Sequence, residues 1–357
     1  MTEVVVGTKK GLFIFEGDPG GEFELTARAF EGDPVDSAVR DPGSGRMLAA
    51  TSSPYYGPKI WYADDPSGEW TQATGVALPA GGDDALEQIW VIEPGEDSVY
   101  AGGSPPALFE SRDHGASWEL NAGIWEHPTR HLWQPGMGGS CVNSIAPWPG
   151  DPDRFAIAIQ AAGVWLTDDH GISWRHGNRG IKAEYLPQEM PTEPIDLCVH
   201  RIARAQKQPN RLFMQFHGGV YRSDDAGESW TDIRAGLPAD FGFPVVLDPA
   251  DPDSAYVIPL TAASDRTTPD GHMRVYETRD AGASWSPLTD GLPQDHAYLN
   301  VLRRAFDQTG EGPALELYFG TTTGEVFGSG DAGKSWSNVA FRLPPVSSVA
   351  AARRAPT

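Results

Sequence analysis

Cysteine, positive charge and long apolar stretches are all scarce in this sequence. The 357 residues include two cysteines, Cys141 and Cys198, so a disulfide framework is excluded. Lysine and arginine number 27 against 49 acidic residues, which gives a formal net charge of −22 at pH 7. This charge argues against nucleic acid and anionic membranes as partners, because both require basic patches.

No long stretch repeats its apolar residues with a helical period of 3.6, whereas the 41 glycines and 31 prolines suit an all-β chain rich in turns. The sequence begins with the strand-like Val4, Val5 and Val6, closely followed by Lys9 and Lys10, which is not the pattern of a signal peptide. We therefore expect a cytoplasmic protein. Separately, we predict no cofactor.

One octet, Ser/Thr-x-Asp-x-Gly-x-Ser-Trp, occurs five times, at residues 111–118, 167–174, 223–230, 278–285 and 329–336. The copies follow one another at 51 to 56 residues, a period typical of propeller blades and other repeat units. The aspartate can accept hydrogen bonds from its own turn, the glycine allows a positive φ, and the tryptophan can fill the space between repeats. Each octet is therefore expected to close a hairpin.

Alternating apolar residues precede the octets, as at 163–166 and 219–222, and two further strand-like runs precede each hairpin, as at 141–146 and 154–159. Four short strands per repeat correspond to a propeller blade. Two weaker copies, at 60–70 and 11–23, raise the count to seven.

The first repeat lacks its innermost strand, and the segment 344–351 resembles the missing strand. Pairing of the N- and C-terminal strands would close the ring and remove its exposed edges. We predict an all-β, seven-bladed β-propeller in a single domain. The predicted blades span residues 1–29 plus 345–352, 30–75, 84–122, 139–178, 196–236, 241–290 and 296–343.

The octet resembles the Asp box, or BNR repeat, of sialidase-like propellers. The whole chain resembles bacterial BNR-repeat proteins of the glycosyl hydrolase or exo-sialidase-like group, as in the stretches 179–181 and 221–225. The resemblance implies a propeller, whereas glycosidase chemistry is only one of several functions such propellers carry. A true sialidase would have three arginines for the substrate carboxylate, the first in an N-terminal Arg-Ile-Pro motif. Here the first arginine is Arg28 and the motif is absent, so sialidase activity is not expected.

The longest predicted connections, at 121–139, 176–196 and 261–273, lie on the face of the ring away from the octets. We call this face the loop face. These connections carry an unusual mixture of acids, imidazoles, guanidinium groups and aromatic rings. The candidate acid, base or catalytic residues are Glu184, Asp196 and His217. The candidate ligand-binding residues are Arg130, His131, Trp133, Tyr185, His200, Arg266 and His296. The alternative interpretation is that these side chains pack the loops and plug the channel.

Cys141 and Cys198 occupy matching places on two predicted innermost strands, with Asn143 and His200 two residues later, so these four side chains could approach one another. Metal-ligand spacings such as Cys-x-x-Cys are absent, and buried free cysteines are usually core residues. We predict no metal site, while the question whether Cys141, Cys198 and His200 form a site stays open.

Two classes of function fit these features. The first is a glycosidase-like enzyme or binding protein for a small polar or anionic ligand at the loop face. The second is a non-catalytic assembly propeller that holds a protein there, and the family resemblance implies a ubiquitin-like sulfur carrier as that partner. A protein-binding surface would expose aromatic residues such as Trp125, Trp133 and Tyr185, whereas an enzyme would bury acids in a pocket.

Overall fold

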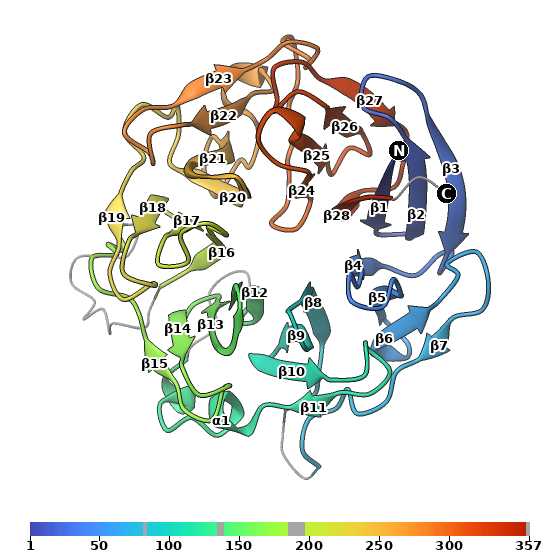
Figure 1. Ribbon diagram of the computed structural model, residues 1–357, viewed down its shortest axis with the longest axis vertical. Coiled ribbons are helices and arrows are strands. Elements are labelled where there is room, and N and C mark those ends of the chain that lie inside the picture. Colours follow the sequence, from blue (N-terminus) through green and yellow to red (C-terminus); the bar gives the residue numbers. More distant parts are fainter. Residues whose placement is uncertain (81–83, 134–138, 185–196, 355–357) are drawn as a thin grey trace.

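Seven four-stranded antiparallel sheets form a closed ring in the computed structural model (Figure 1). The structure describes all residues except 81–83, 134–138, 185–196 and 355–357. Blade 1 contains β28 (Val346–Arg353), β1 (Thr2–Thr8), β2 (Gly11–Gly17) and β3 (Phe23–Ala29). Blade 2 contains β4 (Val35–Arg40), β5 (Met47–Ser53), β6 (Gly57–Ala63) and β7 (Thr71–Gln72).

The remaining blades follow in chain order, each written from its innermost to its outermost strand. Blade 3 has β8 (Gln88–Pro94), β9 (Val99–Ser104), β10 (Ala107–Ser111) and β11 (Glu119–Leu120). Blade 4 has β12 (Val142–Trp148), β13 (Asp151–Ile159), β14 (Gly163–Thr167) and β15 (Arg175–His176). Blade 5 has β16 (Val199–Arg204), β17 (Leu212–Phe216), β18 (Gly219–Ser223) and β19 (Thr231–Asp232). Blade 6 has β20 (Phe241–Asp248), β21 (Asp251–Leu260), β22 (Val275–Thr278) and β23 (Ser286–Leu288). Blade 7 has β24 (Phe306–Thr309), β25 (Glu316–Gly320), β26 (Val326–Ser329) and β27 (Ser337–Ala340).

Helical structure in the described residues is limited to short segments in the connections. They are α1 (Ala122–Trp125) and the 3₁₀ turns η1 (Arg130–Leu132), η2 (Pro269–Gly271) and η3 (Gly312–Ala314). None of these helices is long or apolar enough to cross a membrane.

The seven-bladed ring and its closure by the two ends of the chain are confirmed. Strand β1 pairs with β28 in an antiparallel register that sets Val4 opposite Ala351 and Val6 opposite Val349. Gly7 lies so close to β28 and β4 that a Cβ atom there would approach Ser348 Oγ to 2.4 Å. Blade 7 also binds the closing strand, because Asp307 Oδ2 accepts a hydrogen bond from the Ala351 amide at 2.9 Å.

Each of the five octets forms the predicted hairpin turn. In the blade 5 copy, Asp225 Oδ1 accepts hydrogen bonds from the Ser223 hydroxyl and from the Ser229 amide, both at 2.8 Å. The Gly227 amide donates to Ser223 Oγ at 2.9 Å, and Gly227 has a φ of +99°. The residue before each octet glycine also has a positive φ, a feature that the sequence pattern does not reveal.

The octet tryptophans are buried, and they join neighbouring blades as expected. Trp230 Nε1 donates to the Gly177 carbonyl and Trp285 Nε1 to the Ile233 carbonyl, each at 2.8 Å across a blade boundary. Apolar side chains from successive sheets fill the space between blades, so the core is a ring of inter-blade clusters around the channel.

The innermost strands of blades 2 to 6 share an irregularity that the sequence did not predict. Each has a register shift near its start, at Val35/Ser37, Ile89/Val91, Val142/Ser144, Val199/Arg201 and Gly242/Val245. A bulge of this kind re-aims the side chain that it skips. The skipped residues include Asp36, Trp90, Asn143, His200 and Phe243.

Candidate functional site

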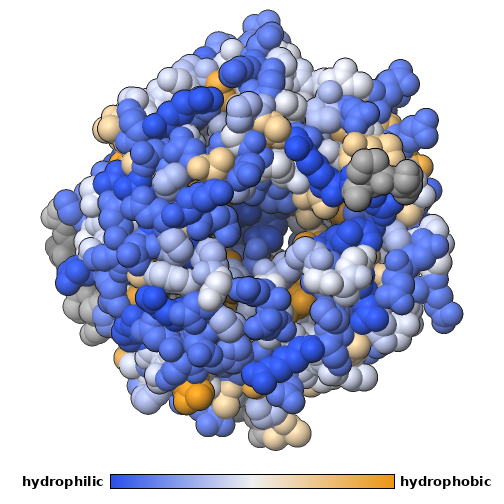
Figure 2. Space-filling view, in the orientation of Figure 1, coloured by the Kyte–Doolittle hydropathy of each residue, from blue (hydrophilic) through white to orange (hydrophobic). Residues whose placement is uncertain are grey.

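The channel has two chemically different ends, and the strand register shows which residues lie at each. Arg204, at the end of β16, is opposite Leu212, which is opposite Ser223, the first octet residue of blade 5. The C-terminal ends of the innermost strands therefore lie at the octet face. Their N-terminal ends lie at the loop face, with the hairpins that join second and third strands. Figure 2 shows the ring hollowed at its centre, with a mainly hydrophilic surface around the hollow.

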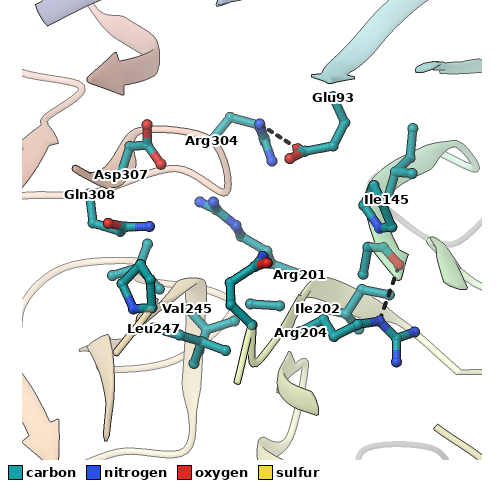
Figure 3. A pocket seen from close by; sticks show the side chains of 16 residues that line it. Glu93, Ile145, Arg201, Ile202, Arg204, Val245, Leu247, Arg304, Asp307 and Gln308 are labelled. Atoms are coloured by element: carbon teal, nitrogen blue, oxygen red, sulfur yellow. Dashed lines mark hydrogen bonds and ion pairs between the residues drawn. The ribbon is translucent and has the colours of Figure 1, made fainter. Parts of the chain in front are cut away.

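A cavity of about 160 Å³ lies in the channel at the octet end, between blades 3, 4, 5, 6 and 7. Its charged lining residues are Glu93, Arg201, Arg204, Arg304 and Asp307 (Figure 3). The side chain of Arg201 extends from blade 5 toward blade 7, where Nη1 donates to the carbonyls of Arg303 and Phe306 at 2.9 and 2.7 Å. We call this hollow the arginine cavity.

Arg201 and Arg204 are unusual because they are buried without an ion-pair partner among the described residues, although the charges of Asp307 and Glu93 act on Arg201 from a distance. Arg201 and Arg204 are 8% and 7% exposed, and no carboxylate of the described residues lies within 4.0 Å of either guanidinium group. Burial, with the nearby Arg304, lowers the pKa of Arg201 to about 10. Burial and Arg154 lower the pKa of Arg204 to about 9. Both side chains therefore stay protonated at neutral pH, but their charge is poorly compensated.

The two acids of the arginine cavity already have partners. Glu93 Oε2 lies 3.0 Å from Arg304 Nη2, an ion pair that joins blades 3 and 7. Asp307 accepts the amide of Ala351 in the closing strand, and burial raises the pKa of its carboxyl group. The acids thus connect parts of the ring. Among the described residues, the hydrogen bonds of Arg201 and Arg204 go to backbone carbonyls, and Arg204 also lies over the ring of Trp148 at 4.7 Å.

At the loop end of the channel, Cys198, His200 and His217 form a compact cluster. One ligand atom from each residue lies within 4.8 Å of the others. His200 is buried, and its Nδ1 lies 2.6 Å from the carbonyl of Gly242. Since a carbonyl only accepts, Nδ1 carries the proton and Nε2 keeps its lone pair.

The electrostatics of this cluster are set by burial and by two arginines. Burial, followed by the charge of Arg303, lowers the pKa of His200 well below its usual value. Burial and Arg266 likewise lower the pKa of His217, so both rings are neutral at pH 7. Burial raises the pKa of the Cys198 thiol, which makes it a poor nucleophile in the free protein.

Arg303 connects the cluster to the rest of the channel. Its Nη2 donates to Gln160 Oε1 at 2.8 Å, and its guanidinium carbon lies 4.7 Å from the Phe243 ring centroid and 5.5 Å from that of Trp90. Its Nε is buried and has no hydrogen-bond partner among the described residues. Two of the bulged residues, Trp90 and Phe243, thus contact the same guanidinium group.

The predicted site residues divide into separate groups. His200, His217 and Arg266 meet at the loop end, where the two imidazole rings are 5.5 Å apart and Arg266 lies over Phe243. Glu184 is exposed and pairs with Arg234 at 3.0 Å, which lowers the pKa of its carboxyl group. Arg234 also donates to the Gly218 carbonyl, next to His217, so Glu184 lies near that hairpin.

Arg130 and Trp133 belong to another group, in the connection between blades 3 and 4. Arg130 stacks on Trp125 with 3.8 Å from guanidinium carbon to ring centroid, and its Nη1 lies 3.3 Å from Asp84 Oδ2. Trp133 is only 7% exposed and packs on Trp165. The exposed aromatic patch expected of a protein-binding surface is therefore not formed by Trp133, which packs in the core.

The other candidates contribute less. His131 is exposed and its Nδ1 contacts the Pro128 carbonyl at 2.9 Å, while His296 is an exposed residue with a φ of +54°. Tyr185 and Asp196 lie outside the described residues.

The residues that line the arginine cavity were missed by the sequence analysis. A signal was available, because a strand that surrounds a channel and carries His200, Arg201 and Arg204 has too many buried polar groups for a plain core strand. The search for a site was directed to the long loops and to Cys141, Cys198 and His200, so Arg201 and Arg204 on the same strand as His200 were not selected.

Comparisons with solved structures give β-propellers. An ancestral GH74 enzyme has a TM-score of 0.59 at 17% identity over 86% of this chain, which spans 38% of that enzyme. Apo AztD from Citrobacter koseri has a TM-score of 0.55 at 11% identity, over 98% of both chains. YCF48 bound to a D1 peptide has a TM-score of 0.50 at 14% identity, over 92% of this chain and 85% of that one. No family model and no curated protein matches this chain. At these identities the likeness concerns the fold alone, which these proteins combine with different functions.

Proposed function

We propose that this protein is a binding propeller that holds a small anion of the carboxylate class in the arginine cavity. The observation that carries the proposal is the burial of Arg201 and Arg204 without an ion pair among the described residues, beside Arg304. Burying a charge is costly unless it is paired, and an anion in the cavity would supply the missing partner.

The sign of the charge inside the cavity supports an anionic ligand. Three arginines and two acids line it, in a protein whose formal net charge is −22. One acid, Asp307, has a raised pKa because it is buried. It therefore loses its negative charge more readily as the pH falls, and the excess of positive charge in the cavity grows. The acidic molecule repels anions at a distance, so the excess of arginines over acids in the cavity lining favours an anion only locally, once it is inside the channel.

The size of the cavity favours a small ligand over a polysaccharide. The volume of the arginine cavity is about 160 Å³. Drug-sized ligands and short oligosaccharides need pockets of about 300 Å³ or more. A mono- or dicarboxylate fits this volume, and the planar guanidinium fork of Arg201 suits the two oxygens of a carboxylate.

The test is isothermal titration calorimetry with succinate, acetate and the neutral isostere acetamide. We expect the carboxylates to bind and acetamide not to bind. Arg201→Gln should weaken binding about 10- to 100-fold, because a hydrogen bond to a charged group contributes about 1.5 to 3 kcal/mol. Arg201→Lys keeps the positive charge but lacks the guanidinium fork, so its affinity should lie between those of the original protein and of Arg201→Gln.

Arg28→Gln is the matched control, because Arg28 is exposed on the outermost strand β3, away from the channel. It should bind like the original protein. Equal binding of succinate by the Arg201→Gln protein, or no binding of either carboxylate by the original protein, would contradict the proposal.

A second candidate function is protein binding at the loop face. The hairpin between β5 and β6 exposes Tyr55 by 88% and Tyr56 by 78%, and exposed aromatic residues of this kind are enriched in interfaces. The ubiquitin-like sulfur carrier that the family resemblance implies is the partner to test. A Tyr55→Ala, Tyr56→Ala double variant should lose its binding, and unchanged binding would exclude this hairpin as the docking surface.

A further inference from the structure

The cluster at the loop end of the channel has the composition of a transition-metal site. Cys198 offers a sulfur, and His200 and His217 offer imidazole nitrogens, all within 4.8 Å of one another. A mixed set of sulfur and nitrogen ligands is typical of Zn²⁺ and related borderline metals. We infer that Cys198, His200 and His217 bind one Zn²⁺-class ion, a site distinct from the arginine cavity.

The local backbone explains how these three residues meet. Cys198 precedes β16, His200 lies in it, and His217 follows β17, while the His217 amide donates to the Cys198 carbonyl at 3.1 Å. The register of the two strands shifts between Val199 and Arg201, so His200 has no opposite residue. Sequence spacing does not reveal this arrangement, because the third ligand comes from the adjacent strand.

His200 is already oriented in the manner of a metal ligand. Its Nδ1–H donates to the Gly242 carbonyl at 2.6 Å, which leaves Nε2 as the ligand atom. Metal-binding histidines commonly donate their other N–H to a carbonyl or carboxylate, which fixes the tautomer and the ring. The rings of Phe241 and Phe243 hold His200 in place at 5.3 and 4.9 Å between centroids.

Three protein ligands leave one position of a tetrahedral ion open, as in catalytic rather than structural zinc sites. Arg266 and Arg303 lower the pKa values of the histidines in the cluster, which means that they oppose positive charge there, and the thiolate of Cys198 would offset part of this repulsion for a divalent ion. With one thiolate ligand the bound ion keeps a net positive charge, so these arginines favour an anion, such as hydroxide, in the open position.

The test uses the full-length protein after chelator treatment, titrated with Co²⁺ alone as a spectroscopic substitute for Zn²⁺. We expect one ion per chain, intense visible bands of a tetrahedral site and a thiolate-to-cobalt charge-transfer band in the near ultraviolet. Zn²⁺ should abolish these bands by displacement. It should also protect Cys198 from alkylation by iodoacetamide.

The variants distinguish ligands from neighbours. Cys198→Ser should remove the charge-transfer band. His217→Ala should weaken Co²⁺ binding by more than the roughly 10- to 100-fold loss that is typical when only a group hydrogen-bonded to a metal ligand is changed. The matched control is Cys141→Ser, because Cys141 is the other cysteine of the chain and lies outside the three-residue cluster. Its spectrum should match that of the original protein.

Circular dichroism melting of every variant separates loss of a ligand from loss of the fold. Because His217 is only partly buried, His217→Ala is informative even if Cys198→Ser unfolds. Absence of a saturable cobalt spectrum in the original protein would overturn the inference, as would an unchanged spectrum in Cys198→Ser. Arg201→Gln should leave the cobalt spectrum intact, so the two sites are tested separately.

Discussion

Removal of one octet carboxylate, in Asp225→Ala, should destabilise the whole ring without affecting ligand binding. The side chain accepts hydrogen bonds from the Ser223 hydroxyl, the Ser229 amide and the Ser229 hydroxyl. A donor left without its acceptor costs about 1 to 3 kcal/mol when buried. Because Asp225 is 41% exposed on the side chain, water can replace part of these bonds, so we expect the lower half of that range.

The measurement is urea denaturation followed by tryptophan fluorescence. Transition midpoints are compared between proteins whose free energy of unfolding depends equally steeply on the urea concentration. Asp225→Asn keeps an acceptor for the Ser229 amide and should lose less than Asp225→Ala. Asp265→Ala, at an exposed position outside the octets, is the control and should change stability by less than about 0.5 kcal/mol. A loss below that threshold in Asp225→Ala would refute the structural role. Selective loss of succinate binding with normal stability would refute it as well.

The same carboxylate makes stability dependent on pH. Burial alone would raise the pKa of Asp225, but the hydrogen bonds from Ser229 and Ser223 outweigh it and hold the pKa below its ordinary value. A lowered pKa in the folded state contributes stability above the unfolded-state value of about 3.9, and this stability is lost as the pH falls through the folded-state pKa. The difference in stability between the original protein and Asp225→Ala should therefore shrink below about pH 4.

Two further predictions concern the ring and its chemistry. Truncation after Leu343 removes β28, whose Val346 and Val349 are buried, and exposes the edge of β1, so it should unfold or aggregate at temperatures where the intact chain is folded. A truncated protein that melts like the intact one would disprove the importance of this closure. A fluorogenic sialoside should not be hydrolysed, because the chain lacks the Arg-Ile-Pro motif that sialidases use; robust turnover would contradict this expectation.

The fold could be predicted because its signals are local and repeated. Every octet carries its own acceptor, hydroxyls and glycine within eight residues, so the turn of Ser223 to Trp230 is specified without reference to the rest of the chain. Five similar turns with a constant period then restrict the architecture to a ring of hairpins. Strand β28 was predicted from the same repetition, because one repeat lacked a strand that the other terminus could supply.

The candidate sites could be predicted only in part. His200, His217 and Arg266 were selected from the sequence, and the structure brings them together at the loop end. Arg130 and Glu184 came from loops of similar composition but are paired with Asp84 and Arg234, in separate groups. The composition of a loop indicates which chemistry is available, whereas the contacts depend on where each loop folds.

By itself, the sequence determined the repeat, the hairpin turns, the seven blades and the pairing of the two ends, because each depends on residues that are close in the chain or on a regular period. Only the tertiary structure decided which side chains face the channel. Arg201 and Arg304 line one cavity although about a hundred residues separate them, and a bulge of one residue changes the alternation at His200. Alternation along a strand predicts two faces, but a bulge changes which side chains face the channel, and the spacing of residues along the strand does not reveal the bulge.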